Sequence, residues 1–182
     1  QEVAQYVTKS GDRVDGVATD VETVDDAASV FCYGQLVRAL LGPDTLLVAA
    51  VFHPFAQPYY PYAAIAASWN VIAPMDYWHS RDIRSYSASQ VERFVTDSIT
   101  TIRAAMPSTP TSAAGSALPV EELGQTYDMY SDDGTGNKAP PTGAEIQSDL
   151  QTARALGCIG ASFFEWQTTT QAEWASIKQF SW

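Results

Sequence analysis

Two acidic residues, Asp20 and Glu22, end a short apolar run that begins at Val14. Side chains alternate sides along a β-strand, so a strand ending here would turn both carboxyl groups to the same face. Parallel α/β sheets and barrels build their active sites at this end of the strands. Neighbouring carboxyls push their pKa values apart, which can keep one protonated as a general acid. The alternatives are a polar strand end or the N-cap of the next helix.

Other side chains that could do chemistry follow later apolar runs. His53 and His79 come after two of them, and no cluster of Cys, His and Asp lies near either in the sequence. A structural or substrate-contacting role is therefore favoured over metal binding. The sequence has no Gly-rich phosphate loop and no G-x-S-x-G motif, so we expect no cofactor and no metal.

Asp76 and Glu165 also lie where strands should end. Alternation turns each of them away from its neighbour, Tyr77 or Trp166. If the inward and outward faces were exchanged, Asp76 and Glu165 would instead form the catalytic pair of carboxyls.

Apolar runs of strand type alternate with helical segments along the whole chain. The patterns predict strands near residues 14–21, 45–52, 70–76, 118–126 and 158–164. They predict helices over 25–41, 62–68, 87–106, 142–156 and 171–180. Gly42 and Gly157 are expected to end two helices, and Ser87 or Ser89 to begin another. Residues 131–143 have the composition of a surface loop.

Five βα units in series imply right-handed crossovers and a parallel sheet or barrel. We therefore expect a single α/β domain over residues 1–182. The two candidate architectures are about five units of a (β/α)8 TIM barrel and an open doubly wound parallel sheet with helices on both faces.

Composition excludes several classes of protein. The chain has 182 residues, of which 46% are hydrophobic, which is enough for one core. A net charge of −11 argues against nucleic acid as a partner, because phosphate binding needs clustered Lys and Arg. No apolar run approaches the roughly 20 residues that span a bilayer, so we expect no membrane insertion. Cys32 and Cys158 lack metal-ligand spacing; buried free thiols are the first interpretation and a mutual disulfide the second.

Three segments at the ends of predicted strands together resemble family 18 glycoside hydrolases, the chitinase-like barrels. Residues 15–22 (DGVATDVE) resemble the family's D-G-x-D-x-D-x-E signature, which lies on its fourth strand. Met75-Asp76-Tyr77 resembles the M-x-Y motif of its sixth strand. Residues 163–166 (FFEW) resemble the eighth-strand segment whose Trp floors the sugar site. The order and rough spacing agree over nearly the whole chain.

Two positions depart from the family pattern. Ala18 stands where the family has an Asp, and Trp78 stands where a polar residue usually follows the Tyr. In the family, the inner carboxylate shares a proton with the middle one. The loss of this carboxylate in this chain would leave the protonation of Asp20 less well adjusted for catalysis. The resemblance to other glycosidase-like barrels is therefore about as good as the resemblance to true chitinases.

The resemblance implies a mechanism. Glu22 would protonate the glycosidic oxygen, and Asp20 would orient the substrate's own 2-acetamido group for attack on the anomeric carbon. Tyr77 would hydrogen-bond the acetamido oxygen, and Trp166 would stack on the sugar ring. We expect substrate contacts from Met75, Trp78, His53 and Tyr127. Further stacking candidates in the loops are Tyr59, Tyr60, Tyr62 and Trp69.

The resemblance also implies that the chain supplies strands four to eight of a barrel. The missing half would come from the same polypeptide or from another chain, and the partner would be a carbohydrate. The chain begins at Gln1 and shows no signal peptide, so we expect a processed product or an excerpt of a secreted or cell-surface protein. The favoured function is a glycoside hydrolase acting on a polysaccharide that can be N-acetylated. The alternative is a catalytically silent glycan-binding or structural barrel, for which Ala18 is the main argument.

Overall fold

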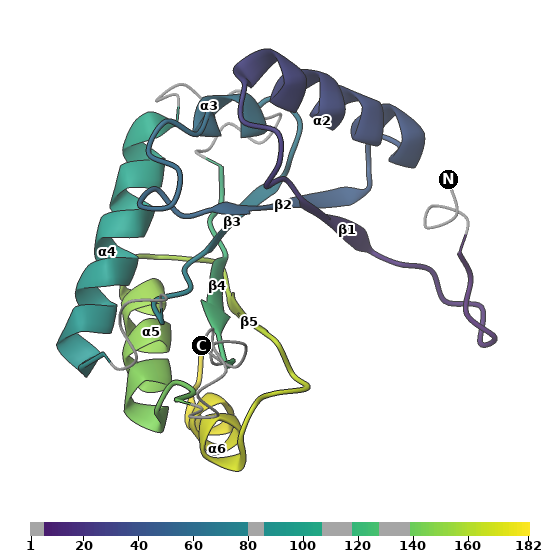
Figure 1. Cartoon of the computed structure of the whole chain (residues 1–182). Helices are drawn as coiled ribbons and strands as arrows, with labels where there is room; N and C mark the ends of the chain where they lie inside the picture. The colour runs from purple at the N-terminus through teal and green to yellow at the C-terminus, as the bar shows by residue number, and fades with distance from the viewer. Residues whose placement is uncertain (1–5, 80–85, 107–117, 128–138) are drawn as a thin grey trace, which may run out of the picture. The chain divides into compact units, whose positions relative to one another are not determined.

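The computed structural model describes residues 6–79, 86–106, 118–127 and 139–182. Helices and strands alternate along the chain, as the sequence patterns predict (Figure 1). The strands are β1 (Gly16–Asp20), β2 (Leu46–Phe52), β3 (Val71–Met75), β4 (Glu122–Gln125) and β5 (Ala161–Phe164). The helices are α2 (Ala27–Leu41), α3 (Tyr62–Ile65), α4 (Ala88–Ala105), α5 (Gly143–Ala155) and α6 (Gln171–Gln179).

The five strands form one sheet in the order β1-β2-β3-β4-β5. The pairs β1–β2, β3–β4 and β4–β5 are parallel, with registers such as Asp20 opposite Ala50 and Gln125 opposite Phe164. A doubly wound sheet reverses its strand order at a switch point, and no reversal occurs here. The fold is therefore α/β with the strand order of a (β/α) barrel segment, and the alternative of a doubly wound sheet is wrong.

The chain divides into two compact units. The first comprises residues 1–73 and 102–119, and the second comprises 74–101 and 120–182. We describe each unit separately.

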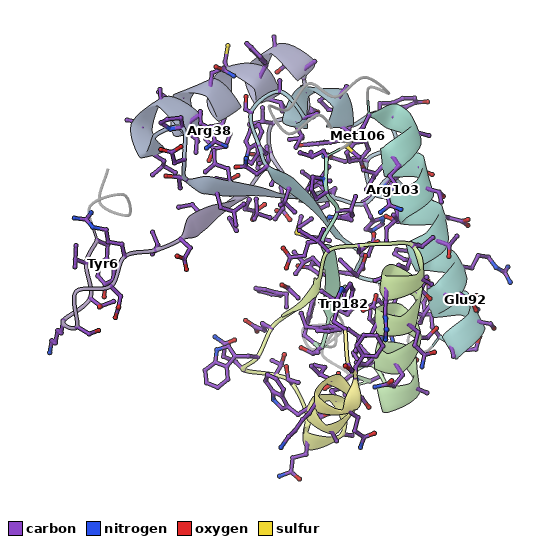
Figure 2. The ribbon with its side chains drawn as sticks, turned by 180° about the vertical axis from the view of Figure 1, so that it is seen from behind. Tyr6, Arg38, Glu92, Arg103, Met106 and Trp182 are labelled. Carbon is purple, nitrogen blue, oxygen red and sulfur yellow. The ribbon has the colours of Figure 1, made fainter. Side chains whose placement is uncertain are left out.

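In the first unit, β1 and β2 bury one face under α2 and the segment around α3. On β2, Leu47, Ala49 and Val51 have no exposed surface. Helix α2 approaches closely through Gly34, where a Cβ atom would lie only 2.3 Å from the Trp69 ring. The guanidinium of Arg38 on α2 (labelled in Figure 2) donates to the carbonyls of Thr45 and Ser68 and to Asn70 Oδ1. These bonds tie the helix to the starts of β2 and β3.

The opposite face of β2 differs from prediction. The continuous apolar run 45–52 predicts burial on both faces, but Leu46 is 44% exposed, and Val48, Ala50 and Phe52 are half-buried. In the described residues only the face that carries Leu47 is fully covered. A continuous apolar run predicts that both faces of the strand are covered. It does not indicate which segment covers each face.

In the second unit, α4 and α5 bury apolar stripes with helical spacing. Val91, Val95 and Ile99 of α4 are fully buried, and so is Ile146 of α5. The Ser87 hydroxyl accepts a hydrogen bond from the Gln90 N–H at 3.3 Å, while Gln90 Oε1 accepts from the Ser87 N–H. This reciprocal cap confirms Ser87 as the start of α4.

Element boundaries and two finer expectations needed correction. β4 begins at Glu122 rather than near 118, and α3 ends at Ile65 rather than near 68. Both cysteines are free, but Cys32 is exposed rather than buried because α2 packs through Val30 and Gly34 on another face. Most of the predicted loop 131–143 lies outside the described residues. Among the helices that the structure describes, none has the length and apolar character needed to cross a membrane.

Candidate functional site

The end of β1 carries the two carboxylates predicted to do chemistry. Ala18 and Asp20 are exposed and Glu22 is half-buried, whereas Thr19 and Val21 between them are buried. The Val21 N–H continues the ladder by donating to the Ala50 carbonyl at 2.9 Å. This alternation places Asp20 and Glu22 on one face, together with Ala18.

Glu22 has the electrostatic environment of a proton donor. Burial raises the pKa of Glu22, and the negative charge of Asp20 raises it further. Both effects disfavour the ionised form of the carboxyl. The pair can therefore hold a proton on Glu22 at a higher pH than an isolated glutamate can.

The aromatic residues of the loops in the first unit divide into structural and exposed groups. The Tyr60 hydroxyl donates to the Val21 carbonyl at 2.9 Å, and the Tyr62 hydroxyl donates to the Phe52 carbonyl at 2.8 Å. Trp69 Nε1 donates to Thr19 Oγ1 at 2.7 Å. These three side chains are buried and tie loop segments to the strands. Tyr59, by contrast, is 96% exposed.

His53, an expected substrate contact, organises the loop that follows β2. Its carbonyl accepts hydrogen bonds from the N–H groups of Ala56 (3.0 Å) and Gln57 (3.2 Å), and its Nδ1 accepts from Ala56 at 3.3 Å. Burial lowers the pKa of His53 to about 4, so the ring is neutral at neutral pH and its Nδ1 is an acceptor.

In the second unit, the ends of β3, β4 and β5 bring three aromatic rings together. Tyr77 and Phe164 stack with centroids 6.3 Å apart, and Tyr127 meets both edge-on at 5.6 and 5.7 Å. Trp166 follows in the chain and is 70% exposed. Two expected substrate contacts differ from this group, because Met75 is 5% exposed and Trp78 has no exposed surface. Trp78 is part of the core in this structure and offers no ring face to a ligand.

Asp76, Glu122 and Asp149 form a carboxyl cluster between the strands and helices α4 and α5, and none of the three has exposed surface. Ser98 of α4 donates to Asp76 Oδ1 at 2.5 Å, whereas the carboxyl oxygens of Glu122 and Asp149 have no hydrogen-bond partner among the described residues. The position of Gly124 explains how Asp149 approaches the sheet, since a Cβ there would lie 3.2 Å from Asp149 Oδ2. Asp76 thus points toward the helices and away from Tyr77, as alternation predicts, and an Asp76–Glu165 catalytic pair loses its basis.

The surroundings of this cluster favour the protonated form of its carboxyls. Burial raises the pKa of Asp76 and Glu122 well above ordinary values, and the negative charges of neighbouring carboxylates add to the effect. Burial raises the pKa of Asp149 to about 7. These shifts favour the protonated form of each carboxyl, which costs less to bury than a carboxylate. No three His, Cys, Asp or Glu side chains within the described ranges are arranged to hold a metal ion.

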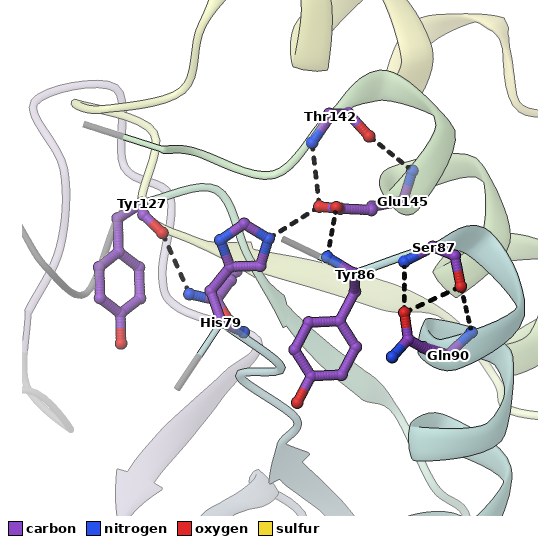
Figure 3. A network of polar contacts seen from close by, with 8 residues as sticks. His79, Tyr86, Ser87, Gln90, Tyr127, Thr142 and Glu145 are labelled. Atoms are coloured by element: carbon purple, nitrogen blue, oxygen red, sulfur yellow. Dashed lines mark hydrogen bonds and ion pairs between the residues drawn. The ribbon is translucent and has the colours of Figure 1, made fainter. Parts of the chain in front are cut away.

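His79 belongs to a second buried network in this unit (Figure 3). The ring Nε2 of His79 lies 2.9 Å from Glu145 Oε2, and the backbone N–H of His79 donates to Gln125 Oε1 at 2.7 Å. Burial opposes ionisation of Glu145, but hydrogen bonds from His79 and from the Tyr86 N–H outweigh it and lower the pKa of Glu145. Glu145 also completes the capping box of α5 with Thr142. The network fixes the start of α5, a structural role for His79.

Sequence reasoning missed the carboxyl cluster, although one signal was available. Asp149 lies three residues after Ile146 and four before Ala153, on the buried stripe of α5. A charged residue on an apolar stripe indicates a buried polar partner. Glu122 lies within the predicted strand near 118–126, where an acidic residue is a second such signal, because it is unusual in a buried strand.

The comparisons with known proteins bear on the fold. No family model matches the sequence, and no curated protein does. Two solved structures resemble it with a TM-score of 0.51 and 12% identity each: the PgaB (BpsB) glycoside hydrolase domain from Bordetella bronchiseptica and bee venom hyaluronidase. They match 82% and 84% of this chain, which spans 42% and 50% of their lengths. At this identity the likeness supports the fold alone, a segment of a (β/α) barrel.

Proposed function

We propose that this chain is part of a glycoside hydrolase that cleaves an N-acetylated polysaccharide. The observation that carries the proposal is the pair at the end of β1. Asp20 and Glu22 share one face, and both burial and the charge of Asp20 raise the pKa of Glu22. The glycosidase-like fold supports this function, because strand ends of this kind are where such barrels carry out chemistry.

In the proposed mechanism, Glu22 is the general acid that protonates the glycosidic oxygen as the bond breaks. The carbonyl oxygen of the substrate's 2-acetamido group attacks the anomeric carbon, and Asp20 orients that group and stabilises its developing positive charge. Water then opens the cyclic intermediate, with Glu22 acting as the base. The roles that the family resemblance implies for Tyr77 and Trp166 belong to residues of the second unit and stay predictions.

We further propose that the remaining barrel strands come from the same polypeptide or from another chain, and that the protein is secreted or on the cell surface. The chain spans half or less of the two similar structures, which supports the first point.

A second candidate function is a glycan-binding barrel without turnover. Ala18 favours it, because this residue is exposed on the same face as Asp20, where the family resemblance calls for a third carboxyl. The two candidates differ in turnover and not in ligand.

The distinguishing experiment compares two pentasaccharides that differ only in their acetyl groups. Chitopentaose and its fully de-N-acetylated form are incubated with the purified protein, and new reducing ends and the anomer first released are measured. We expect cleavage of chitopentaose alone, with retained β-configuration. Equal cleavage of both would refute substrate assistance, and tight binding without any cleavage would favour the glycan-binding barrel.

A further inference from the structure

A pocket of about 270 Å³ lies in the first unit beside the end of β1. Its lining comes from the segment after β1 and the loop after β2: Asp25, Ala56, Gln57, Pro58, Tyr59 and Tyr60. We propose that this pocket is a sugar-binding subsite that holds one neutral or amino-bearing pyranose of the substrate and rejects uronic acids. The assignment rests on the proposed function, since this sugar would belong to the same polysaccharide whose glycosidic bond Glu22 is proposed to cleave.

Tyr60 connects the pocket to the carboxylate pair. Its hydroxyl donates to the carbonyl of Val21, the residue between Asp20 and Glu22. Burial raises the pKa of Tyr60, and the charges of Asp20 and Asp25 raise it further, so both carboxylates lie within electrostatic range of the ring. A saccharide at the end of β1 could therefore continue into the pocket.

The lining has the groups that recognise a sugar. Tyr59 is 96% exposed, so its ring can cover one apolar face of a pyranose. Gln57 Oε1 is buried without a hydrogen-bond partner among the described residues, and a sugar hydroxyl would supply the missing donor. The exposed Asp25 carboxylate can accept from further hydroxyls or from an amine. At about 270 Å³ the pocket is near the small end of ligand sites, which suits one ring.

The loop is held in place before any ligand binds. The His53 carbonyl accepts from the Ala56 and Gln57 N–H groups, and the Gln57 carbonyl accepts from the Tyr60 N–H at 3.2 Å. A preformed loop loses little freedom on binding, which favours affinity. The charge of the site sets its specificity, because Asp25 and the nearby Asp20 would repel a sugar carboxylate.

The test measures binding rather than turnover, so that it is independent of the catalytic proposal. Chitopentaose is titrated calorimetrically into the Glu22→Gln protein and into the same protein carrying Tyr59→Ala, Tyr59→Phe or Gln57→Leu. We expect Tyr59→Ala and Gln57→Leu to weaken binding by about 2- to 10-fold, and Tyr59→Phe to bind as the parent does, because it keeps the ring. Tyr6→Ala is the matched control, since Tyr6 (labelled in Figure 2) is 59% exposed and is not among the residues that line the pocket.

A second probe tests the sugar class. A pentamer of galacturonic acid should bind at least about 10-fold more weakly than chitopentaose, and Asp25→Asn should narrow that gap. Equal affinity for the two pentamers would overturn the class assigned here. Unchanged chitopentaose binding in both Tyr59→Ala and Gln57→Leu would overturn the subsite and leave the role of Glu22 untouched. Loss of binding in these variants would support the subsite even if Glu22→Gln still hydrolysed the substrate.

Discussion

The carboxyl groups of the two units occupy opposite environments. Asp20 and Glu22 lie on an exposed or half-buried strand face, whereas Asp76, Glu122 and Asp149 have no exposed surface. Both groups have members with raised pKa values, and burial is the first cause in each. A raised pKa therefore does not identify a catalytic group by itself; a substrate must also be able to reach the proton. By that criterion the β1 pair is suited to chemistry and the buried cluster to structure.

The largest expected effect separates the two groups by activity. Glu22→Gln keeps the shape of the side chain but removes the proton that it donates, so hydrolysis of chitopentaose should fall by about 10²- to 10⁴-fold. Glu92→Gln, on the exposed face of α4, is the matched control and should hydrolyse as the wild type does. Glu122→Gln should leave the hydrolysis rate of the folded protein within a few-fold of wild type. A hydrolysis rate for Glu22→Gln near that of the wild type would contradict the role of Glu22 as the general acid.

The buried cluster should appear in stability rather than activity. Its carboxyls have raised pKa values in the folded state, about 7 for Asp149, and ordinary values near 4 when unfolded. Between these values the folded state binds more protons, so stability is full below about pH 4 and falls as pH rises through about 7. We expect the unfolding free energy to drop by on the order of a few kcal/mol across that window.

Urea denaturation at pH 5 and pH 8 measures this drop. Asp149→Asn should make the stability less dependent on pH, because the amide stays neutral at both pH values. The control is Asp97→Asn, an exposed residue that precedes Ser98 on α4, and it should keep the wild-type slope. An electrostatic interaction with Cys158 also raises the pKa of Glu122, as a smaller cause than burial. Stability that rises from pH 5 to pH 8 in the wild type would show that the cluster is ionised.

The smallest expected effect concerns Ala18, which shares the face of Asp20. Ala18→Asp restores a third carboxyl there and should raise kcat/KM or widen its pH range by less than about 10-fold, equivalent to roughly one pKa unit of coupling. Ala18→Asn, similar in size but neutral, provides the comparison. If neither variant changes the profile of an active wild type, the departure at Ala18 has no catalytic consequence.

These same residues show which parts of the fold and of the candidate site can be predicted from the sequence. Periodicity was enough for the five strands and for the faces of Asp20 and Asp76, because alternation along a strand is a local property. The burial of Trp78 and the exposure of Cys32 differ from expectation, because both depend on which segments pack against the residue. Tyr59 and Tyr60 are adjacent and of one type, yet one is exposed and the other buried. The Tyr60 hydroxyl bonds to the Val21 carbonyl, 39 residues away, and its ring packs against Tyr62, so contacts distant in sequence or made by the fold bury Tyr60.

The most direct test of the account is the pH dependence of kcat/KM on chitopentaose for the wild type and Asp20→Asn, with Asp44→Asn as the exposed control. The basic limb reports the pKa of the free enzyme's essential acid. Because the charge of Asp20 raises the pKa of Glu22, removing that charge should move the basic limb to lower pH, in addition to slowing turnover. Asp44→Asn should leave the limb in place. A limb at the same pH in wild type and Asp20→Asn would contradict the assignment of Glu22 as an acid tuned by Asp20.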